Sequence, residues 1–112
     1  MSRKKAVQRI EQVVNEKSSS LDLSELQLEE VPPEIAKCMH LNLLSLSLNQ
    51  ITSIPEWFGQ LSNLTVLFLS FNQITKIPKV ITQLPNLRWL SIEGNQITEI
   101  PEALGQMSSL TG

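Results

Sequence analysis

A short phrase recurs along this chain at a fixed interval of 23 residues. Asn49, Asn72 and Asn95 each open a copy, and the three copies read NQITSIP, NQITKIP and NQITEIP. No insertion or deletion changes the interval between them. Repeats of this length indicate an array of stacked units, because each unit is too short to bury an apolar core by itself.

An atypical copy stands one interval before the first asparagine. LQLEEVP begins at Leu26: Leu28, Val31 and Pro32 stand where the phrase has isoleucine, isoleucine and proline, but the asparagine is lost. Leucine or isoleucine also recurs upstream of each asparagine, at Leu41, Leu44, Leu46, Leu64, Leu67, Leu69, Leu87, Leu90 and Ile92. The sequence therefore predicts four repeats, at residues 18–40, 41–63, 64–86 and 87–109, and the start of a fifth.

The LxL part of each repeat predicts a short β-strand. Two leucines separated by one residue point to the same side of an extended strand, while the residue between them points away. Strands this short are stable only when copies pair side by side, so we expect a parallel sheet with its leucines facing the core. The same interior is expected to take the residues two beyond the asparagine position, Leu28, Ile51, Ile74 and Ile97.

The consensus LxxLxLxxNxIxxIPxxIxxLxx resembles the leucine-rich-repeat family over residues 18–110. Its 23-residue length and IP pair are similar to the intracellular Ras-group type and to the arrays that precede GTPase modules in bacterial Roco proteins. The resemblance implies an α/β leucine-rich-repeat solenoid, a short horseshoe arc with a parallel concave β-sheet and an irregular or short-helical convex side. It also implies that Asn49, Asn72 and Asn95 form a ladder of buried amides, bonded to backbone groups of the turn and of the neighbouring coil.

The two ends of the array have different sequences. Residues 1–17 predict an N-terminal capping helix, because apolar residues fall on one face at helical spacing: Ala6, Val7, Ile10, Val13 and Val14. A membrane-surface helix and a partner-binding helix are the other interpretations. The apolar face is small, aliphatic and next to a sheet edge that needs a cover, which favours capping.

Residues 18–112 hold the repeats, and their last unit is incomplete. The fifth repeat begins at Leu110 and the sequence stops at Gly112. Leu90, Ile92, Leu104 and Met107 would lie at this open end. Because an open apolar strand edge invites association, we expect either a longer array or self-association through the uncapped C-terminal end.

The outward residues of the concave face form columns with one residue per repeat. The middle of these columns is apolar, with Leu48 and Phe71 at its edge and four further residues on neighbouring strands: Leu43, Val66, Phe68 and Trp89. Exposed apolar patches mark binding sites, and aromatic residues dominate interface energetics. The alternative is that these side chains only pack on one another across the strands. We interpret all six as candidate partner-binding residues.

Composition argues against several other classes of function. A net charge of −2 and an isoelectric point near 5.3 argue against nucleic-acid binding, which needs clustered cations. No segment is long enough to span a bilayer. A single cysteine, Cys38, excludes an internal disulfide and favours a cytoplasmic setting.

Chemistry-bearing residues are sparse. His40 has no second ligand or acid at metal or triad spacing, and Cys38 occupies a leucine column, so it is expected to be a small buried hydrophobe. We therefore expect no enzyme activity, no metal and no cofactor. The leading hypothesis is a scaffold that binds a partner protein through its concave face, and the resemblance implies a role in intracellular signalling. The alternatives are a self-associating structural solenoid and a regulatory N-terminal part of a larger GTPase- or kinase-linked protein.

Overall fold

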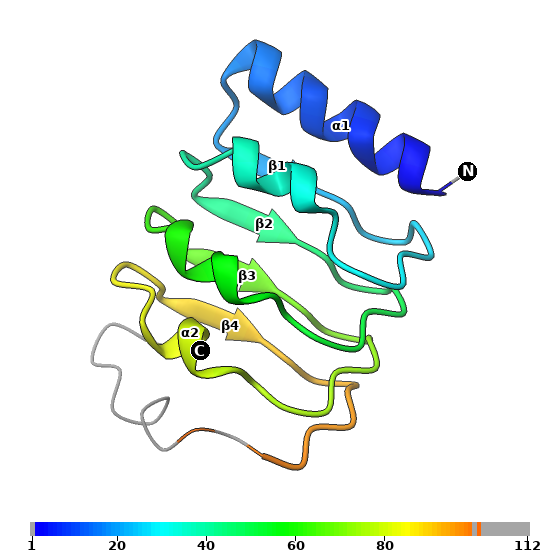
Figure 1. Cartoon of the computed structure of the whole chain (residues 1–112), viewed down its shortest axis with the longest axis vertical. Coiled ribbons are helices and arrows are strands. Elements are labelled where there is room, and N and C mark those ends of the chain that lie inside the picture. The colour runs from blue at the N-terminus through cyan, green and yellow to red at the C-terminus, as the bar shows by residue number, and fades with distance from the viewer. Residues whose placement is uncertain (1, 100, 102–112) are drawn as a thin grey trace.

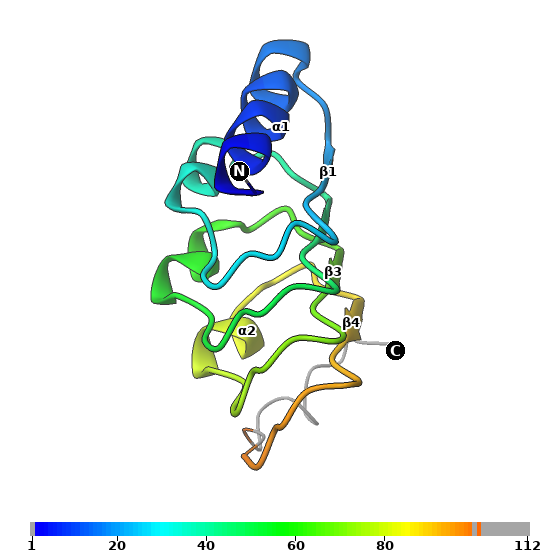
Figure 2. The same ribbon diagram turned by 90° about the vertical axis from the view of Figure 1, so that its right-hand side faces the viewer.

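The computed structural model of this chain describes residues 2–99 and 101. Its coils lie on one another in a single stack with a helix at one end (Figure 1). In chain order the elements are α1 (Ser2–Glu16), β1 (Ser20–Asp22), η1 (Pro33–Lys37), β2 (Leu43–Ser45), η2 (Glu56–Gln60), β3 (Val66–Phe68), α2 (Lys79–Thr82) and β4 (Trp89–Ser91). Figure 2 shows the strands along one side of the stack and the helical turns along the other. The predicted solenoid, with its parallel sheet and short-helical return side, is confirmed.

The four strands form one parallel sheet in the order β1-β2-β3-β4. Leu44 pairs with Leu67, and Leu67 pairs with Leu90, so each step across the sheet is one interval of 23 residues. The leucines at these central strand positions are buried, including Leu21 in β1. The sequence period is therefore the register of the sheet.

The core is a continuous stack of aliphatic columns between the sheet and the return segments. The return side contributes two buried columns, one of Ile35, Phe58 and Ile81 and one of Cys38, Leu61 and Leu84. Leu28, Ile51 and Ile74 are buried where the chain leaves the strands, whereas Ile97 is only half-buried. The predicted C-terminal end of the array, with Leu104, Met107 and the fifth repeat, lies outside the described residues.

Helix α1 covers the first coil of the stack. Ala6, Ile10 and Val13 are its buried residues, at positions i, i+4 and i+7 of one helical face. Val7 is half-buried. Val14, which we expected on the same face, is 37% exposed, because it lies about 100° further around the helix than Val13.

The C-terminus of α1 is a Schellman turn. The N–H of Lys17 donates to the carbonyl of Val14 at 3.4 Å, and the N–H of Ser18 donates to that of Val13 at 3.1 Å. Lys17 has a φ of 55°, the left-handed conformation that stops a helix at this position. The turn sends the chain from Glu16 directly into β1.

The prolines of the IP pairs begin the helical turns of the convex side. Pro32, Pro55 and Pro78 stand immediately before η1, η2 and α2, with φ between −62° and −72°. Proline fixes φ in this range and lacks an N–H, which the first turn of a helix leaves unbonded in any case. The IP pair thus turns each coil into its return path.

Candidate functional site

Buried asparagine amides fix the turn that follows each strand. The Oδ1 atom of Asn49 accepts the backbone N–H groups of Leu26 and Leu28, both at 3.0 Å. Its Nδ2 atom donates to the carbonyls of Leu23 at 3.0 Å and Leu46 at 2.9 Å. One side chain therefore holds together the turn of its own coil and the turn of the coil before it.

The next two asparagines repeat this arrangement. Asn72 donates to the carbonyl of Leu46 at 3.0 Å and accepts the N–H of Ile51 at 3.0 Å. Asn95 donates to the carbonyl of Leu69 at 2.9 Å. Asn49 and Asn72 are buried, while Asn95 is half-buried. The ladder positions the end of each strand relative to its neighbours.

The sheet carries an apolar row and a mixed row on its outward side. The register aligns Leu43 with Val66 and Val66 with Trp89, and it aligns Phe68 with Ser91 in the second row. Leu43, Val66 and Phe68 are half-buried, and Trp89 is 46% exposed. The indole Nε1 of Trp89 donates to the hydroxyl of Ser91 at 3.0 Å, which holds the ring along its strand.

Leu48 and Phe71 extend this surface beyond the strand ends. Their side chains are 47% and 52% exposed. Both residues have positive φ, 61° for Leu48 and 59° for Phe71. Bulky side chains rarely adopt this conformation, because the Cβ atom crowds the following carbonyl. Two apolar side chains are thus held outward on a strained backbone.

Sequence patterns alone did not reveal this strained column. The same position is occupied by Glu25, with a φ of 59°, and by Gly94, with a φ of 73°. Glycine in one of four equivalent positions is the only local signal, because glycine adopts positive φ without strain. All four coils share the conformation, including the first, where Leu26 replaces the asparagine and its N–H is bonded by Asn49 of the next coil.

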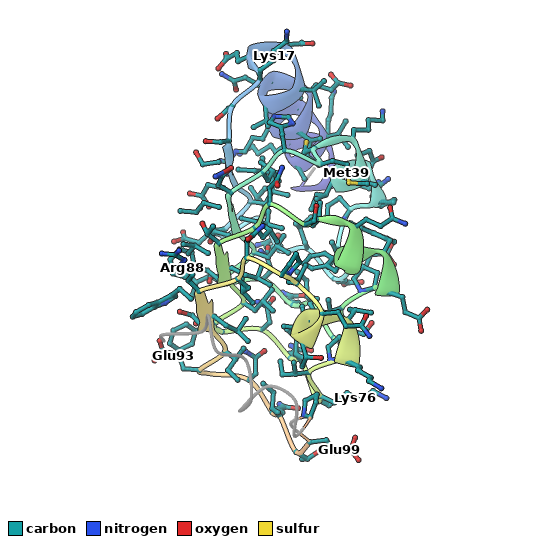
Figure 3. The ribbon with its side chains drawn as sticks, turned by 90° about the vertical axis from the view of Figure 1, so that its left-hand side faces the viewer. Lys17, Met39, Lys76, Arg88, Glu93 and Glu99 are labelled. Atoms are coloured by element: carbon teal, nitrogen blue, oxygen red, sulfur yellow. The ribbon has the colours of Figure 1, made fainter. Side chains whose placement is uncertain are left out.

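Carboxylates lie on the same face as the apolar side chains. The Ser24 hydroxyl and the Ser24 backbone N–H, the latter at 2.9 Å, hold the pKa of Asp22 below its ordinary value, and Arg9 adds to this effect. Glu25 and Glu93 are exposed. Figure 3 shows Glu93 on the sheet side of the molecule, away from Lys76 and Met39.

The remaining candidates lie away from this face or inside the core. Cys38 is fully buried, and this burial raises the pKa of its thiol while Lys37 acts in the opposite direction. His40 is half-buried in the turn before β2. Among residues 2–99 and 101, no three His, Cys, Asp or Glu side chains are grouped to hold a metal ion. No helix in this same part of the chain has the length and apolar character needed to cross a membrane.

Comparison with known proteins identifies the repeat. Residues 20–112 match the family described as leucine-rich repeat region. No curated protein sequence matches the chain significantly. Among solved structures, the leucine-rich repeat domain of the type III effector XopL is 25% identical, with a TM-score of 0.80, over 90% of this chain and 34% of that one.

Two further bacterial structures are also similar. A Shigella effector leucine-rich repeat domain is 27% identical, with a TM-score of 0.75, over 89% of this chain and 42% of that one. A leucine-rich repeat protein of Leptospira interrogans is 27% identical, with a TM-score of 0.67, over 89% of this chain and 32% of that one. This chain therefore spans less than half the length of each structure. Because the family match covers most of its residues and the coils stack as predicted, the chain belongs to the leucine-rich-repeat family.

Proposed function

We propose that this chain is a scaffold that binds a partner protein through the concave face of its sheet. Leucine-rich-repeat domains generally mediate protein–protein interaction and typically do so without catalysis. The proposal assigns this role to one surface, the concave patch, which consists of Leu43, Leu48, Val66, Phe68, Phe71 and Trp89.

The observation that carries the proposal is the conformation of Leu48 and Phe71. A left-handed backbone costs a residue with a side chain about 1–2 kcal/mol. Each of these side chains also leaves about half of its apolar surface in water. Glycine or asparagine at either position would suit the backbone better and expose nothing apolar. Strain and exposure together at one place support contact with another molecule.

Packing between neighbours explains only part of the patch. Leu43, Val66 and Phe68 are half-buried and stabilise the sheet as cross-strand neighbours. Phe71 and Trp89, by contrast, are 52% and 46% exposed. Aromatic side chains of this kind contribute strongly to the centre of interfaces.

We also propose a setting for the scaffold. The 23-residue repeat with its IP pair supports membership of the Ras-group or Roco-like type. The alternative role is a regulatory N-terminal part of a larger GTPase- or kinase-linked protein. The lone Cys38 supports a cytoplasmic location. The resemblance to Ras-group scaffolds supports a role in intracellular signalling. In this proposal residues 1–17 form the capping unit, and residues 18–40, 41–63, 64–86 and 87–109 form four repeats.

The double variant Leu48→Asn with Phe71→Asn tests the proposed surface. It removes two exposed apolar side chains and replaces them with a residue that tolerates positive φ, so we expect the fold to remain stable. Proteins captured from an extract of the source organism are identified by mass spectrometry for both chains. Species captured by the natural chain are expected to be lost with the double variant, while its thermal midpoint is equal or higher.

Val14→Ser with Met39→Ser is the matched control. These side chains are 37% and 39% exposed and lie outside the concave patch. The control is expected to capture the same species as the natural chain. If the patch variant captures them equally well, the concave face is not the binding surface. Sedimentation of both variants separates partner binding from self-association, because a solenoid that associates through its end keeps its oligomeric state when the patch is changed.

A further inference from the structure

A row of side chains lies along the edge of the concave face where the strands end. We name this surface the strand-end margin, and it consists of Glu25, Leu48, Phe71, Gly94 and Glu93. The backbone N–H groups of Glu25, Leu48 and Phe71 each donate to a carbonyl of the next coil, at 3.2, 2.9 and 2.8 Å. The sheet ladder thus continues through the margin and fixes its side chains at the spacing of the coils.

Carboxylates stand at both ends of the strand-end margin. Glu25 lies one coil before Leu48, and Glu93 lies in the coil after Phe71. Both carboxylates are exposed, and neither forms a hydrogen bond or ion pair with any residue in the described part of the chain. Two apolar side chains are therefore flanked by two negative charges.

Glu25 and Glu93 form no ion pair with Arg9 or Arg88 in the part of the chain that the structure describes. Arg9 donates to the backbone carbonyl of Asp22 at 2.9 Å, and its charge helps to lower the pKa of the Asp22 side-chain carboxyl. Arg88 precedes β4, whereas Glu93 follows it, so the two lie at opposite ends of that strand. The strand-end margin consequently favours a partner segment that carries positive charge on both sides of an apolar centre.

The spacing of the coils indicates which conformation that segment has. Neighbouring strands lie about 4.8 Å apart, so two steps along the margin cover about 10 Å. Residues i and i+7 of an α-helix, two turns apart, are separated by about 10.5 Å along its axis. Same-face residues of an extended strand are separated by about 7 Å or about 13 Å. The spacing of same-face residues in a helix along the solenoid axis therefore matches the spacing of the coils, whereas the spacing in an extended segment does not.

We infer that the strand-end margin binds an amphipathic helix of the partner, with basic, apolar, apolar and basic residues on four successive turns. The two apolar residues lie over Leu48 and Phe71, and lysine or arginine lies opposite Glu25 and Glu93. The inference rests on the proposed function, because it specifies the segment that the concave patch recognises. Phe71 is the anchor, since its ring is the most exposed apolar group at the centre of the margin.

Selection from a displayed library of random peptides of about 18 residues, five helical turns, tests the inference on the whole chain. The selected peptides are expected to carry lysine or arginine one turn outside a pair of apolar residues. The tightest is synthesised, and its affinity is measured by calorimetry. A proline at its centre is expected to abolish binding, because proline breaks a helix.

Charge variants of the chain test the flanking contacts. Glu25→Gln with Glu93→Gln is expected to lower the affinity for the synthesised peptide about fivefold, the effect of two exposed ion pairs. The affinity is also expected to depend less on salt concentration. Glu30→Gln with Glu56→Gln is the matched control. These exposed carboxylates lie outside the margin, so the same change in net charge is expected to leave the affinity within about twofold.

The outcomes separate this inference from the proposed function. Four results would overturn the inference. The first two are selected peptides without flanking basic residues and peptides that keep their affinity with a central proline. The others are equal effects of the two charge variants and failure to select any peptide. The proposed function has its own test, since Leu48→Asn with Phe71→Asn must abolish binding of the natural partner whatever peptide is selected. If that binding persists, the concave patch itself is wrong.

Discussion

The aromatic ring of Phe71 lies directly against the α-carbon of Gly94, its counterpart in the next coil. A Cβ atom on Gly94 would overlap this ring, and the φ of 73° at Gly94 also disfavours a side chain. The ring thus fills the space that the missing side chain leaves open. This contact supports the ring in its exposed position on the concave face.

The contact predicts a coupling between the two positions. Gly94→Ala is expected to lower the free energy of unfolding by about 2–3 kcal/mol, from positive φ and from overlap with the ring. With Phe71→Asn already present, only the backbone cost of about 1 kcal/mol is expected to remain. Urea unfolding of the two single variants and the double variant measures the coupling. Additive effects would show that ring and glycine do not interact.

The asparagine ladder predicts a loss of stability from an apolar replacement. Asn72→Leu removes the amide that bonds the carbonyl of Leu46 and the N–H of Ile51 across two coils. These buried groups are left without partners, so we expect a loss of about 2–4 kcal/mol despite the added apolar surface. Urea unfolding measures it. The control is Asn63→Leu at an exposed turn, expected within about 0.5 kcal/mol of the natural chain; equal effects would contradict the role of the ladder.

The buried leucine column that contains Leu69 predicts a loss of unfolding free energy from cavity formation. Leu69 is fully buried, so Leu69→Ala leaves a cavity and is expected to cost about 2–5 kcal/mol in unfolding free energy. Val14→Ala on the outer side of α1 is expected to change stability by about 0.5 kcal/mol or less. A loss at Leu69 no larger than that at Val14 would rule out the burial of this column.

Asp22 predicts a pH dependence with a defined sign. Its pKa in the folded chain is lowered, so its ionised form stabilises the fold above the ordinary carboxyl pKa, about pH 4, and this contribution is lost as the pH falls through the folded pKa. In Ser24→Ala the hydroxyl is absent while the backbone donor remains, so the Asp22 pKa is expected to rise toward its ordinary value. Titration of the Asp22 carboxyl carbon by NMR measures both values. An unchanged pKa in the variant would exclude the serine hydroxyl as the cause.

Burial of Cys38 predicts its reactivity. The thiol is enclosed in the core and its pKa is raised, so the nucleophilic thiolate is rare and shielded in the folded chain. Labelling by a thiol reagent is expected to be slow in buffer and to accelerate with denaturant in parallel with the unfolding transition. Fast labelling under native conditions, with the far-UV circular dichroism unchanged, would mean that this coil opens locally.

The spacing of one residue type allowed most of the fold to be predicted. Because Asn49, Asn72 and Asn95 recur at one interval, the register of the sheet follows before any coordinate is known. The helix at the N-terminus was equally visible in its apolar spacing. Its buried face was predicted too broadly, because Val14 is exposed whereas Val13 is buried. Apolar spacing does not show which of two adjacent valines faces the first coil.

The sequence by itself determined which residues stack, because a repeating period permits only one register in which every coil buries its own leucines. It also determined the set of residues on the outward face. Only the tertiary structure decided how Leu48 and Phe71 are held. The asparagine after each of them bonds a carbonyl of its own coil and a carbonyl of the coil before, and the residue at this position has positive φ in all four coils, whatever its side chain. Backbone conformation at that point depends on contacts between segments 23 residues apart, which no local propensity contains.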